Sequence, residues 1–162
     1  MIQLFKKKEK DRNLYAPVSG TCIPLSAVND SVFSSLMMGD GVAFQISEDT
    51  IYAPADGKIT VIANTRHAIG MLADNASEIL IHVGLETVQL NGKGFEVLVS
   101  MNQKVKKGTP LIKVDMHYMK EKDIDLTTSF IITNSSDMQL IKLEENKAVT
   151  ASVSAVIQCM KR

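Results

Sequence analysis

Short runs of apolar and β-branched residues recur along the chain, and Gly, Pro, Asn and Asp separate them at close intervals. Runs of this length between turn residues are typical of strands. The pattern predicts strands near residues 41–46, 57–63, 78–83, 94–99, 110–114, 127–133, 138–142 and 148–158. Many short strands with few helices favour an all-β fold, an antiparallel sandwich or barrel.

Helical periodicity is weak, and only two segments favour a helix. One is "DSVFSSLMMG", residues 30–39, where Asp30 stands at the position of a helix cap, and the other is "DMHYMKEKDID", residues 115–125. We therefore expect one or two short helical turns beside the strands.

The chain also contains an internal repeat. "LYAPVSGTCIPL" at 14–25 and "IYAPADGKITVI" at 51–62 share the frame Tyr-Ala-Pro-x-x-Gly. In each copy the proline fixes φ at the edge of a strand, and the glycine permits a tight reversal into the next strand. A duplication in an all-β chain predicts two related halves packed face to face.

Composition excludes several classes of function. The 162 residues are 45% hydrophobic and carry 18 basic and 18 acidic side chains, as expected of one globular domain. Balanced charge and the absence of Trp give no reason to expect nucleic-acid binding. Cys22 and Cys159 form no C-x-x-C pair. With no apolar run of roughly 20 residues and no secretory signal, we expect a cytoplasmic protein with reduced thiols.

The first residues, "MIQLFKKKEKDR", differ from the rest. We divide the chain into a flexible basic N-terminal tail, residues 1–12, and one domain, residues 13–162. An amphipathic tail of this kind can also make weak contact with an anionic membrane, and this alternative stays open.

The segment "ILIHVG", residues 79–84, places an imidazole in a strand. With a period of two, one face is entirely apolar and is explained as core: Ile79, Ile81, Val83 and Leu85. His82 falls on the opposite face, together with Glu78, Leu80, Gly84 and Glu86. The core therefore does not account for this histidine.

A second histidine follows a neighbouring strand. A period of two over residues 59–67 places Thr65 and His67 on one side, where the threonine hydroxyl can bond the imidazole and orient it. His117 stands in a polar segment, and we expect it to be exposed. A single histidine on a strand is usually structural. Two on adjacent strands, however, can meet above the sheet.

Two kinds of chemistry suit such a pair. Both imidazoles can bind zinc, if a third ligand completes the site. Alternatively, one imidazole is a nucleophile toward phosphorus, and the other donates a hydrogen bond to the phosphoryl oxygens. The chain contains no H-E-x-x-H motif and no Walker-type loop. Spacing alone leaves both alternatives open.

Several segments, in order, resemble the glucose-type enzyme IIA of the bacterial phosphoenolpyruvate–sugar phosphotransferase system. They are "YAPVSG", "NDSVFSSLMMGDGVAF", "YAPADGKITVI", "TRHAIGM", "EILIHVGLETVQLNGKGF" and "VKKGTPLIKVD". The resemblance runs from about residue 13 to the C-terminus. It implies an antiparallel β-sandwich of the duplicated hybrid motif type, in agreement with the repeat.

The resemblance implies a phosphotransferase component, a histidine phosphocarrier that requires no cofactor. His82 matches the phosphorylated histidine, with Nε2 as the attacking atom and the backbone carbonyl of Gly84 holding Nδ1. His67 matches the histidine that hydrogen-bonds the phosphoryl oxygens, and Thr65 matches the threonine that orients it.

Family partners are phosphorylated HPr as donor and the cysteine of an enzyme IIB domain as acceptor, during sugar uptake. Residues matching the docking surface are Asp30, Val32, Phe33, Leu80 and Glu86. Some members have regulatory targets, or bind zinc when a partner ligand completes a site with the two histidines. His67 and His82 match that pair.

Two alternatives remain beside the relay. A zinc-dependent peptidase is one, because related β-folds carry such enzymes, but the expected His-x-His pair is absent. A regulatory protein-binding module that uses His67 and His82 is the other. A carrier with Lys58 as its modified residue is disfavoured, because no methionine pair flanks that lysine. Since the chain begins with Met and has no length for IIB or IIC domains, we expect a free-standing component.

Overall fold

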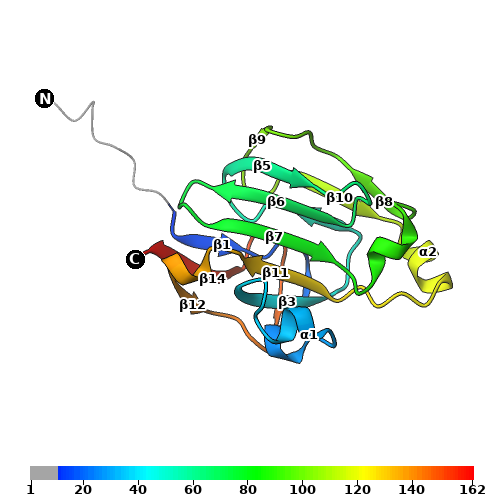
Figure 1. The fold of residues 1–162 in the computed structure, drawn as a ribbon, viewed down its shortest axis with the longest axis horizontal. Coiled ribbons are helices and arrows are strands. Elements are labelled where there is room, and N and C mark those ends of the chain that lie inside the picture. The colour runs from blue at the N-terminus through cyan, green and yellow to red at the C-terminus, as the bar shows by residue number, and fades with distance from the viewer. Residues whose placement is uncertain (1–10) are drawn as a thin grey trace, which may run out of the picture.

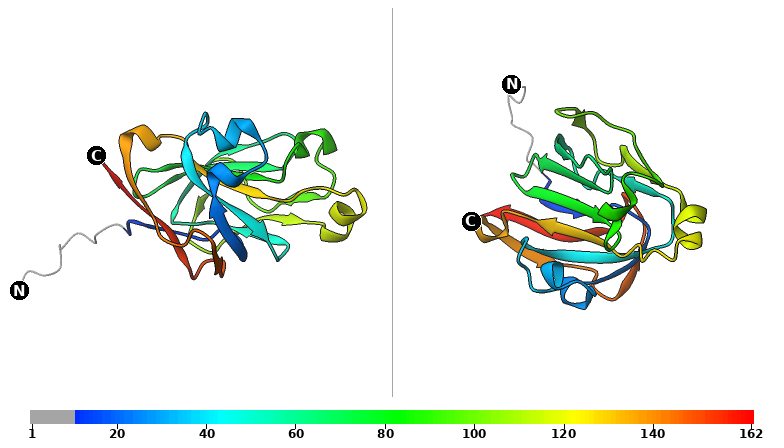
Figure 2. Two further views of the ribbon diagram at one scale, coloured as in Figure 1. Left: turned by 90° about the horizontal axis from the view of Figure 1, so that it is seen from below. Right: turned by 45° about the vertical axis from the view of Figure 1, so that its right-hand side comes forward.

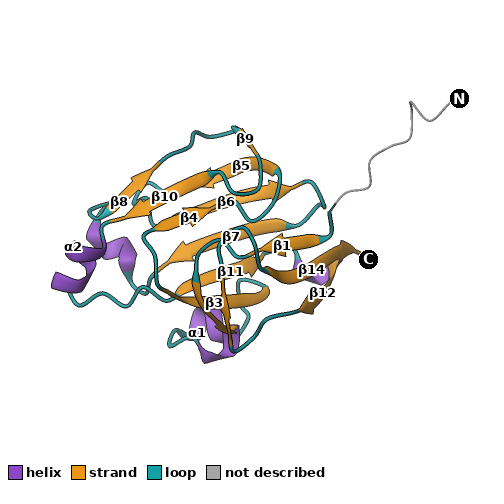
Figure 3. Ribbon diagram, turned by 180° about the vertical axis from the view of Figure 1, so that it is seen from behind, coloured by secondary structure: helices purple, strands orange, loops and turns teal. Residues whose placement is uncertain are grey.

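The computed structural model describes residues 11–162, and within that range fourteen strands form three antiparallel sheets. The largest sheet has the order β13 (Lys147–Val149), β2 (Gly20–Pro24), β3 (Asp40–Ile46), β11 (Thr128–Ile132), β7 (Glu78–Val83), β6 (Ala68–Ala73), β5 (Gly57–Ile62) and β9 (Lys104–Val105). Two three-stranded sheets lie behind it in Figure 1 and in front in Figure 3. One consists of β1 (Asn13–Tyr15), β14 (Ala155–Lys161) and β12 (Met138–Lys142), the other of β4 (Thr50–Tyr52), β10 (Pro110–Val114) and β8 (Phe95–Val97).

This arrangement confirms the predicted antiparallel sandwich. The eight-stranded sheet keeps two edges, at β13 and β9, so it does not close into a barrel. The main core fills the space between the layers, and Phe44 and Phe130 pack there with ring centroids 6.3 Å apart. Burial of these inward side chains is the principal source of stability, since apolar area removed from water favours folding.

Both predicted helical segments form short helices. α1 (Ser31–Ser34) begins at Asp30, whose Oδ1 accepts a hydrogen bond from Val32 N at 2.9 Å. α2 (Met116–Glu121) begins in the same way at Asp115. Three 3-10 turns complete the helical content of the described residues: η2 (Leu25–Ala27), η3 (Thr87–Leu90) and η4 (Ser135–Asp137).

A second apolar cluster lies on the outer face of the eight-stranded sheet. It consists of Leu25, Val28, Phe33, Ala43 and Ile131. Figure 2 (left) shows η2 and α1 on this outer side, away from the two smaller sheets. The sheet is therefore covered on both faces at this end, and a side chain on the outer face here is not simply exposed to solvent.

Strand β7 separates the two clusters as its alternation predicts, with one exception. Ile79, Ile81 and Val83 lie in the main core. Leu85 does not continue this row, because β7 ends at Val83 and Gly84 turns the chain with φ +82°. Leu85 therefore packs against the second cluster, on the side of His82.

The continuous strand expected over residues 59–67 is wrong. β5 ends at Ile62, and residues 63–66 form a tight turn in which Arg66 N donates to the carbonyl of Ala63 at 2.8 Å. β6 comes next and was not among the expected runs. A register shift between Ile59 and Val61 further breaks the alternation. Similarly, residues 148–158 hold two strands, β13 and β14, because Ser152 reverses the chain with φ +64°.

The internal repeat appears in the structure as two symmetric sets of hydrogen bonds. Tyr15 N donates to the carbonyl of Pro54 at 2.9 Å, and Tyr52 N donates to the carbonyl of Pro17 at 2.7 Å. The next strands of the two copies are also equivalent, because β2 lies between β13 and β3 while β5 lies between β9 and β6. The predicted duplication is confirmed.

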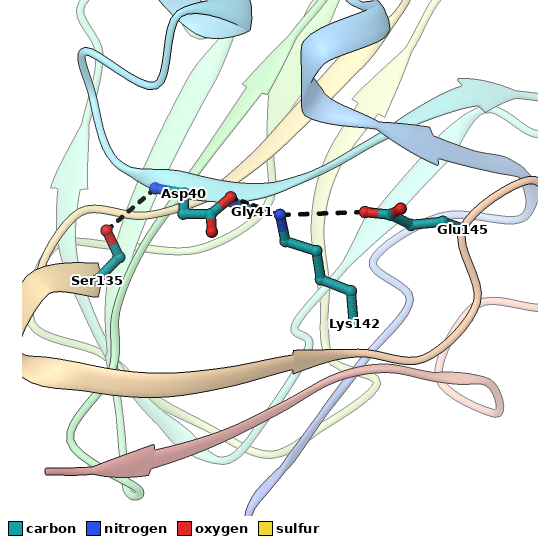
Figure 4. A network of polar contacts seen from close by, with 5 residues as sticks. All are labelled: Asp40, Gly41, Ser135, Lys142 and Glu145. Carbon is teal, nitrogen blue, oxygen red and sulfur yellow. Dashed lines mark hydrogen bonds and ion pairs between the residues drawn. The ribbon is translucent and has the colours of Figure 1, made fainter.

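A polar network fastens the start of β3 to the other layer (Figure 4). Asp40 N donates to Ser135 Oγ at 3.1 Å, and Asp40 Oδ1 lies 2.7 Å from Lys142 Nζ on β12. Glu145 extends the network at 4.0 Å from the same ammonium group. The contacts join β3, η4 and β12. They therefore hold the eight-stranded sheet to the sheet of β1, β14 and β12 at this end.

The expected tail, residues 1–12, and its membrane contact fall outside the described residues except for its last two positions. Asp11 accepts hydrogen bonds from Asn13 N and from Tyr15 Oη, both at 2.9 Å. The carbonyl of Arg12 accepts one from Cys159 N on β14. Across the part of the chain that is described, no helix has the length and apolar character needed to cross a membrane.

Candidate functional site

Two histidines meet on the outer face of the eight-stranded sheet. His82 lies on β7, and His67 directly precedes β6, the neighbouring strand. The hydrogen bond from Val83 N to the carbonyl of His67, at 2.7 Å, fixes the two backbones. The ring centroids are 4.7 Å apart, and the rings meet edge to face at 79°. The expected meeting of the two histidines is therefore present, although Thr65 and His67 share a turn and not a strand.

The Gly84 carbonyl fixes the His82 ring. Nδ1 of His82 lies 3.0 Å from the oxygen of Gly84. A carbonyl can only accept a hydrogen bond, so Nδ1 carries the proton and Nε2 of the neutral ring carries a free lone pair. A glycine is required at this turn, because φ is +82° and a Cβ atom would lie 2.5 Å from Cγ2 of Thr87.

Thr65 holds the His67 ring in the same manner. Its Oγ1 lies 2.8 Å from Nδ1 of His67, two residues along the chain. The tight turn makes this contact, because Arg66 adopts φ +61° and returns the chain toward Thr65. When the hydroxyl donates to Nδ1, Nε2 of His67 carries the ring proton and becomes a hydrogen-bond donor.

Burial makes both rings poor bases. Burial and, after it, the adjacent His67 lower the pKa of His82 to about 4, although the Gly84 bond and Asp30 oppose the shift. Burial also lowers the pKa of His67. Both imidazoles are therefore neutral at pH 7, and the Nε2 lone pair of His82 is available as a nucleophile.

The five residues matched to a docking surface occupy different environments. Phe33 is only 6% exposed, and its ring packs on His82 with centroids 4.8 Å apart. Leu80 is half-buried against the same outer cluster. Val32 is 42% exposed, and Glu86 is exposed at a left-handed φ of +56°. Asp30 caps α1, and its negative charge raises the pKa of His82.

Further exposed apolar groups lie in segments that follow or flank these residues in the fold. Met37 is 76% exposed and Met38 is 42% exposed, in the loop after α1. On the other side of Leu80, Val61 and Leu72 help to line a cavity of about 430 Å³. Consecutive apolar residues in "SLMMG", just after a helix cap, could have predicted an exposed apolar loop from the sequence. The cavity residues become neighbours only through strand pairing, so the sequence offers no comparable signal for them.

The two Nε2 atoms are the ring nitrogens left for a metal. His67 and His82 alone supply two ligands, and a zinc site needs at least a third. Among residues 11–162, no group of three or more His, Cys, Asp or Glu side chains is arranged to hold a metal ion. A zinc ion at this site would therefore need a ligand from another molecule.

Comparison with known proteins agrees with this geometry. Residues 12–138 match the model of the family described as phosphoenolpyruvate-dependent sugar phosphotransferase system, EIIA 1. The chain belongs to this family. It is thus a phosphotransferase component that relays a phosphoryl group in sugar uptake. Family membership favours phosphoryl transfer over the peptidase alternative for the pair of histidines.

The relatives include both separate and fused proteins. The chain is 40% identical over 154 residues to a glucose-specific EIIA component of Staphylococcus epidermidis, covering 94% of this chain and 93% of that protein. It is 46% identical over 134 residues to a glucoside-specific EIICBA component of Staphylococcus carnosus, covering 83% of this chain and 19% of that protein. The chain thus spans about a fifth of the length of the fused relative.

A solved structure shows the same fold. The glucose permease IIA of Mycoplasma capricolum superposes with a TM-score of 0.78 at 35% sequence identity. The match covers 90% of this chain and 93% of that one. The likeness therefore extends over nearly the whole β-sandwich.

Proposed function

We propose that His82 is the residue that carries the phosphoryl group, with phosphorylated HPr as the donor and a cysteine of an enzyme IIB domain as the acceptor. The observation that carries the proposal is the 3.0 Å contact between Nδ1 of His82 and the oxygen of Gly84. It leaves Nε2 as the unprotonated nitrogen, beside a second neutral imidazole.

In the first transfer, the Nε2 lone pair of His82 attacks phosphorus. A new N–P bond forms, the N–P bond to the HPr histidine breaks, and its electron pair returns to that ring nitrogen. In the second transfer, the sulfur of the acceptor cysteine forms an S–P bond while the N–P bond at His82 breaks. The proton stays on Nδ1 and remains hydrogen-bonded to the Gly84 carbonyl throughout, so His82 needs no proton exchange to keep its geometry.

His67 stabilises the phosphoryl group in both directions. Because the Thr65 hydroxyl bonds Nδ1 of His67, the Nε2–H group of His67 is the donor for the phosphoryl group. It donates to the equatorial oxygens, where negative charge is spread in the transition state. The close ring contact of 4.7 Å supports this assignment. Because the His67 ring is neutral, it acts as a hydrogen-bond donor rather than as a fixed positive charge.

The acceptor cysteine belongs to a partner. Cys22 and Cys159 are both fully buried, and burial raises their pKa to about 12 and about 11 respectively. Neither is a ready nucleophile. The fused relatives are named EIICBA components, which supports an enzyme IIB domain as the acceptor.

Docking uses an apolar surface with an acidic rim. Val32 and Leu80 form its apolar part, the buried Phe33 supports it through its contact with His82, and Asp30 and Glu86 face basic groups of HPr and of enzyme IIB. Regulatory targets, and a zinc ion completed by a partner's ligand, would use the same surface. The names of the relatives favour glucose or a glucoside as the sugar, and partners of this kind support a cytoplasmic location.

The first experiment measures intact mass after incubation with phosphoenolpyruvate, enzyme I and HPr. Wild type should gain one acid-labile phosphoryl group, and His82→Ala should gain none, because the attacking nitrogen is gone. His117→Ala is the matched control, since this histidine is exposed on α2, and it should behave as wild type. Phosphorylation that persists in His82→Ala would overturn the assignment.

A further inference from the structure

Ser129 is a buried hydroxyl beside the nucleophile. The side chain is 1% exposed, and its Oγ has no hydrogen-bond partner within residues 11–162. A buried hydroxyl without a partner is unfavourable, and most such groups find one. The neighbouring Thr128 illustrates the usual solution, because its Oγ1 donates to the carbonyl of Leu126 at 2.9 Å.

Strand register places Ser129 directly next to His82. β11 pairs with β7 so that Ser129 lies opposite His82, and β6 pairs with β7 so that Ala68 lies opposite His82 on the other side. Residues opposite each other in an antiparallel pair project to the same face, with Cβ atoms about 4.5–5.5 Å apart. Ile131, two residues on, lies in the outer cluster, so this face of β11 is the outer one.

His82 therefore has polar groups on both flanks. His67 approaches from the β6 side, and Ser129 stands on the β11 side. A phosphoryl group on Nε2 brings three oxygens that carry nearly two negative charges at pH 7, and each accepts hydrogen bonds strongly. The single Nε2–H group of His67 can donate to only part of these acceptor oxygens.

We propose that the Ser129 hydroxyl is a further ligand of the phosphoryl group, donating to one of its oxygens once His82 is phosphorylated. The inference rests on the proposed function and goes beyond it, because it assigns a phosphoryl-binding role to a third strand. The hydroxyl is left unpaired in the free protein and gains its partner in the phosphorylated one. The energy of this bond then favours phosphorylated His82 over phosphorylated HPr.

The test compares wild type with Ser129→Ala in the equilibrium with phosphorylated HPr. Loss of one hydrogen bond to a charged group should lower the equilibrium constant for phosphoryl acceptance by about tenfold to a hundredfold. The ³¹P NMR signal of phosphorylated His82 should also shift. The thermal midpoint of the unphosphorylated protein should not fall, because the variant removes a hydroxyl that has no partner.

Two further variants separate a donor effect from a packing effect. Ser129→Cys keeps the size but has only a weak donor, and should resemble Ser129→Ala. Thr128→Val removes a buried hydroxyl from the same strand but on the opposite face; it should lower the thermal midpoint and leave the ³¹P signal unchanged.

An unchanged equilibrium constant and an unchanged ³¹P signal in Ser129→Ala would overturn the inference. If wild type accepts nothing from phosphorylated HPr, the proposed function fails instead. His82 can then be loaded with the small donor phosphoramidate, and the ³¹P comparison still decides the role of Ser129. The two failures are thus distinguishable.

Discussion

The two repeats share one scaffold but differ in the connection that leaves their second strand. In the first repeat, β2 is joined to β3 by residues 25–39, which contain η2 and α1. In the second, β5 is joined to β6 by a short segment that includes the turn at residues 63–66. The frame Tyr-Ala-Pro-x-x-Gly and its hydrogen bonds are the same in both.

The site arises from this difference. The long connection of the first repeat places Phe33 4.8 Å from the His82 ring, and the short connection of the second places His67 4.7 Å from it. The common strands provide rigidity, whereas the unequal connections provide an apolar cover and a hydrogen-bond donor. The nucleophile His82 itself lies on strand β7, and the two connections supply the groups packed around it.

Replacing the shared glycines should produce the largest effects, and should show how far the repeats are equivalent. A Cβ atom on Gly20 would lie 2.1 Å from the carbonyl oxygen of Gln45, and one on Gly57 would lie 2.3 Å from that of Leu72. Gly20 also has φ +153°. Gly20→Ala should cost about 2–4 kcal/mol of unfolding free energy and Gly57→Ala somewhat less, by urea denaturation. A smaller loss in Gly20→Ala than in Gly57→Ala would contradict this ranking.

Much of this arrangement could be predicted from local sequence. The alternation in "EILIHV", the two Asp helix caps and the repeated Tyr-Ala-Pro-x-x-Gly frame each act over a few residues, and the structure contains all three. The predicted continuation of strand β5 to His67 was wrong. A bulge after Ile59 and the left-handed backbone of Arg66 break the period of two. No local pattern reveals either feature.

Contacts between distant strands were equally inaccessible. Ser129 looks like any polar residue in "TTSFIIT" until strand pairing sets it opposite His82. Phe33 matches a docking residue in the resemblance, yet its burial results from the way α1 folds back onto β3 and β11. Sequence thus predicts the faces of single strands well, but not which faces meet.

The donor supplied by the second repeat can be removed alone. His67→Gln should still accept a phosphoryl group, because His82 keeps its nucleophile. Onward transfer to enzyme IIB should slow by about tenfold to a hundredfold, since a transition-state donor is altered. Rapid-quench kinetics measures both steps. Loss of acceptance in His67→Gln, with acceptance retained in His82→Ala, would reverse the roles of the two histidines.

The two repeats act on the charge of His82 in opposite directions. Asp30, from the first, raises its pKa, and His67, from the second, lowers it, around a value of about 4 that burial dominates. Asp30→Asn should therefore lower the pKa further, with the helix cap kept, and His67→Gln should raise it. NMR titration of the His82 ring measures both. Shifts in the same direction would contradict the assignment.

The same pKa sets a pH dependence of stability. The ring binds a proton near pH 6.5 in the unfolded chain but only near pH 4 in the folded one. The contribution of His82 to the free energy of unfolding is fully present above pH 6.5 and is lost as the pH falls from 6.5 to about 4. In that range the free energy of unfolding falls by about 1.4 kcal/mol per pH unit. Urea denaturation at several pH values should show a weaker slope in His82→Ala.

Replacement of Phe33, the apolar side chain that the first repeat packs on His82, should give the smallest effect. Phe33→Leu keeps an apolar group against His82 but loses the ring contact, so stability should fall by about 1 kcal/mol. If Phe33 serves docking, KM for phosphorylated HPr should rise severalfold while kcat changes little. Steady-state transfer assays separate the two constants. A fall in kcat alone would instead place Phe33 among the groups that orient His82.

The crossed bonds of Tyr15 with Pro54 and of Tyr52 with Pro17 make the two halves of the chain depend on each other. Each copy of the frame satisfies the backbone of the other, so a chain with one copy would leave these groups unpaired. Two separate chains can make the same bonds about a twofold axis. The crossed bonds thus make each half of the chain act toward the other as one subunit of a symmetric pair acts toward its partner.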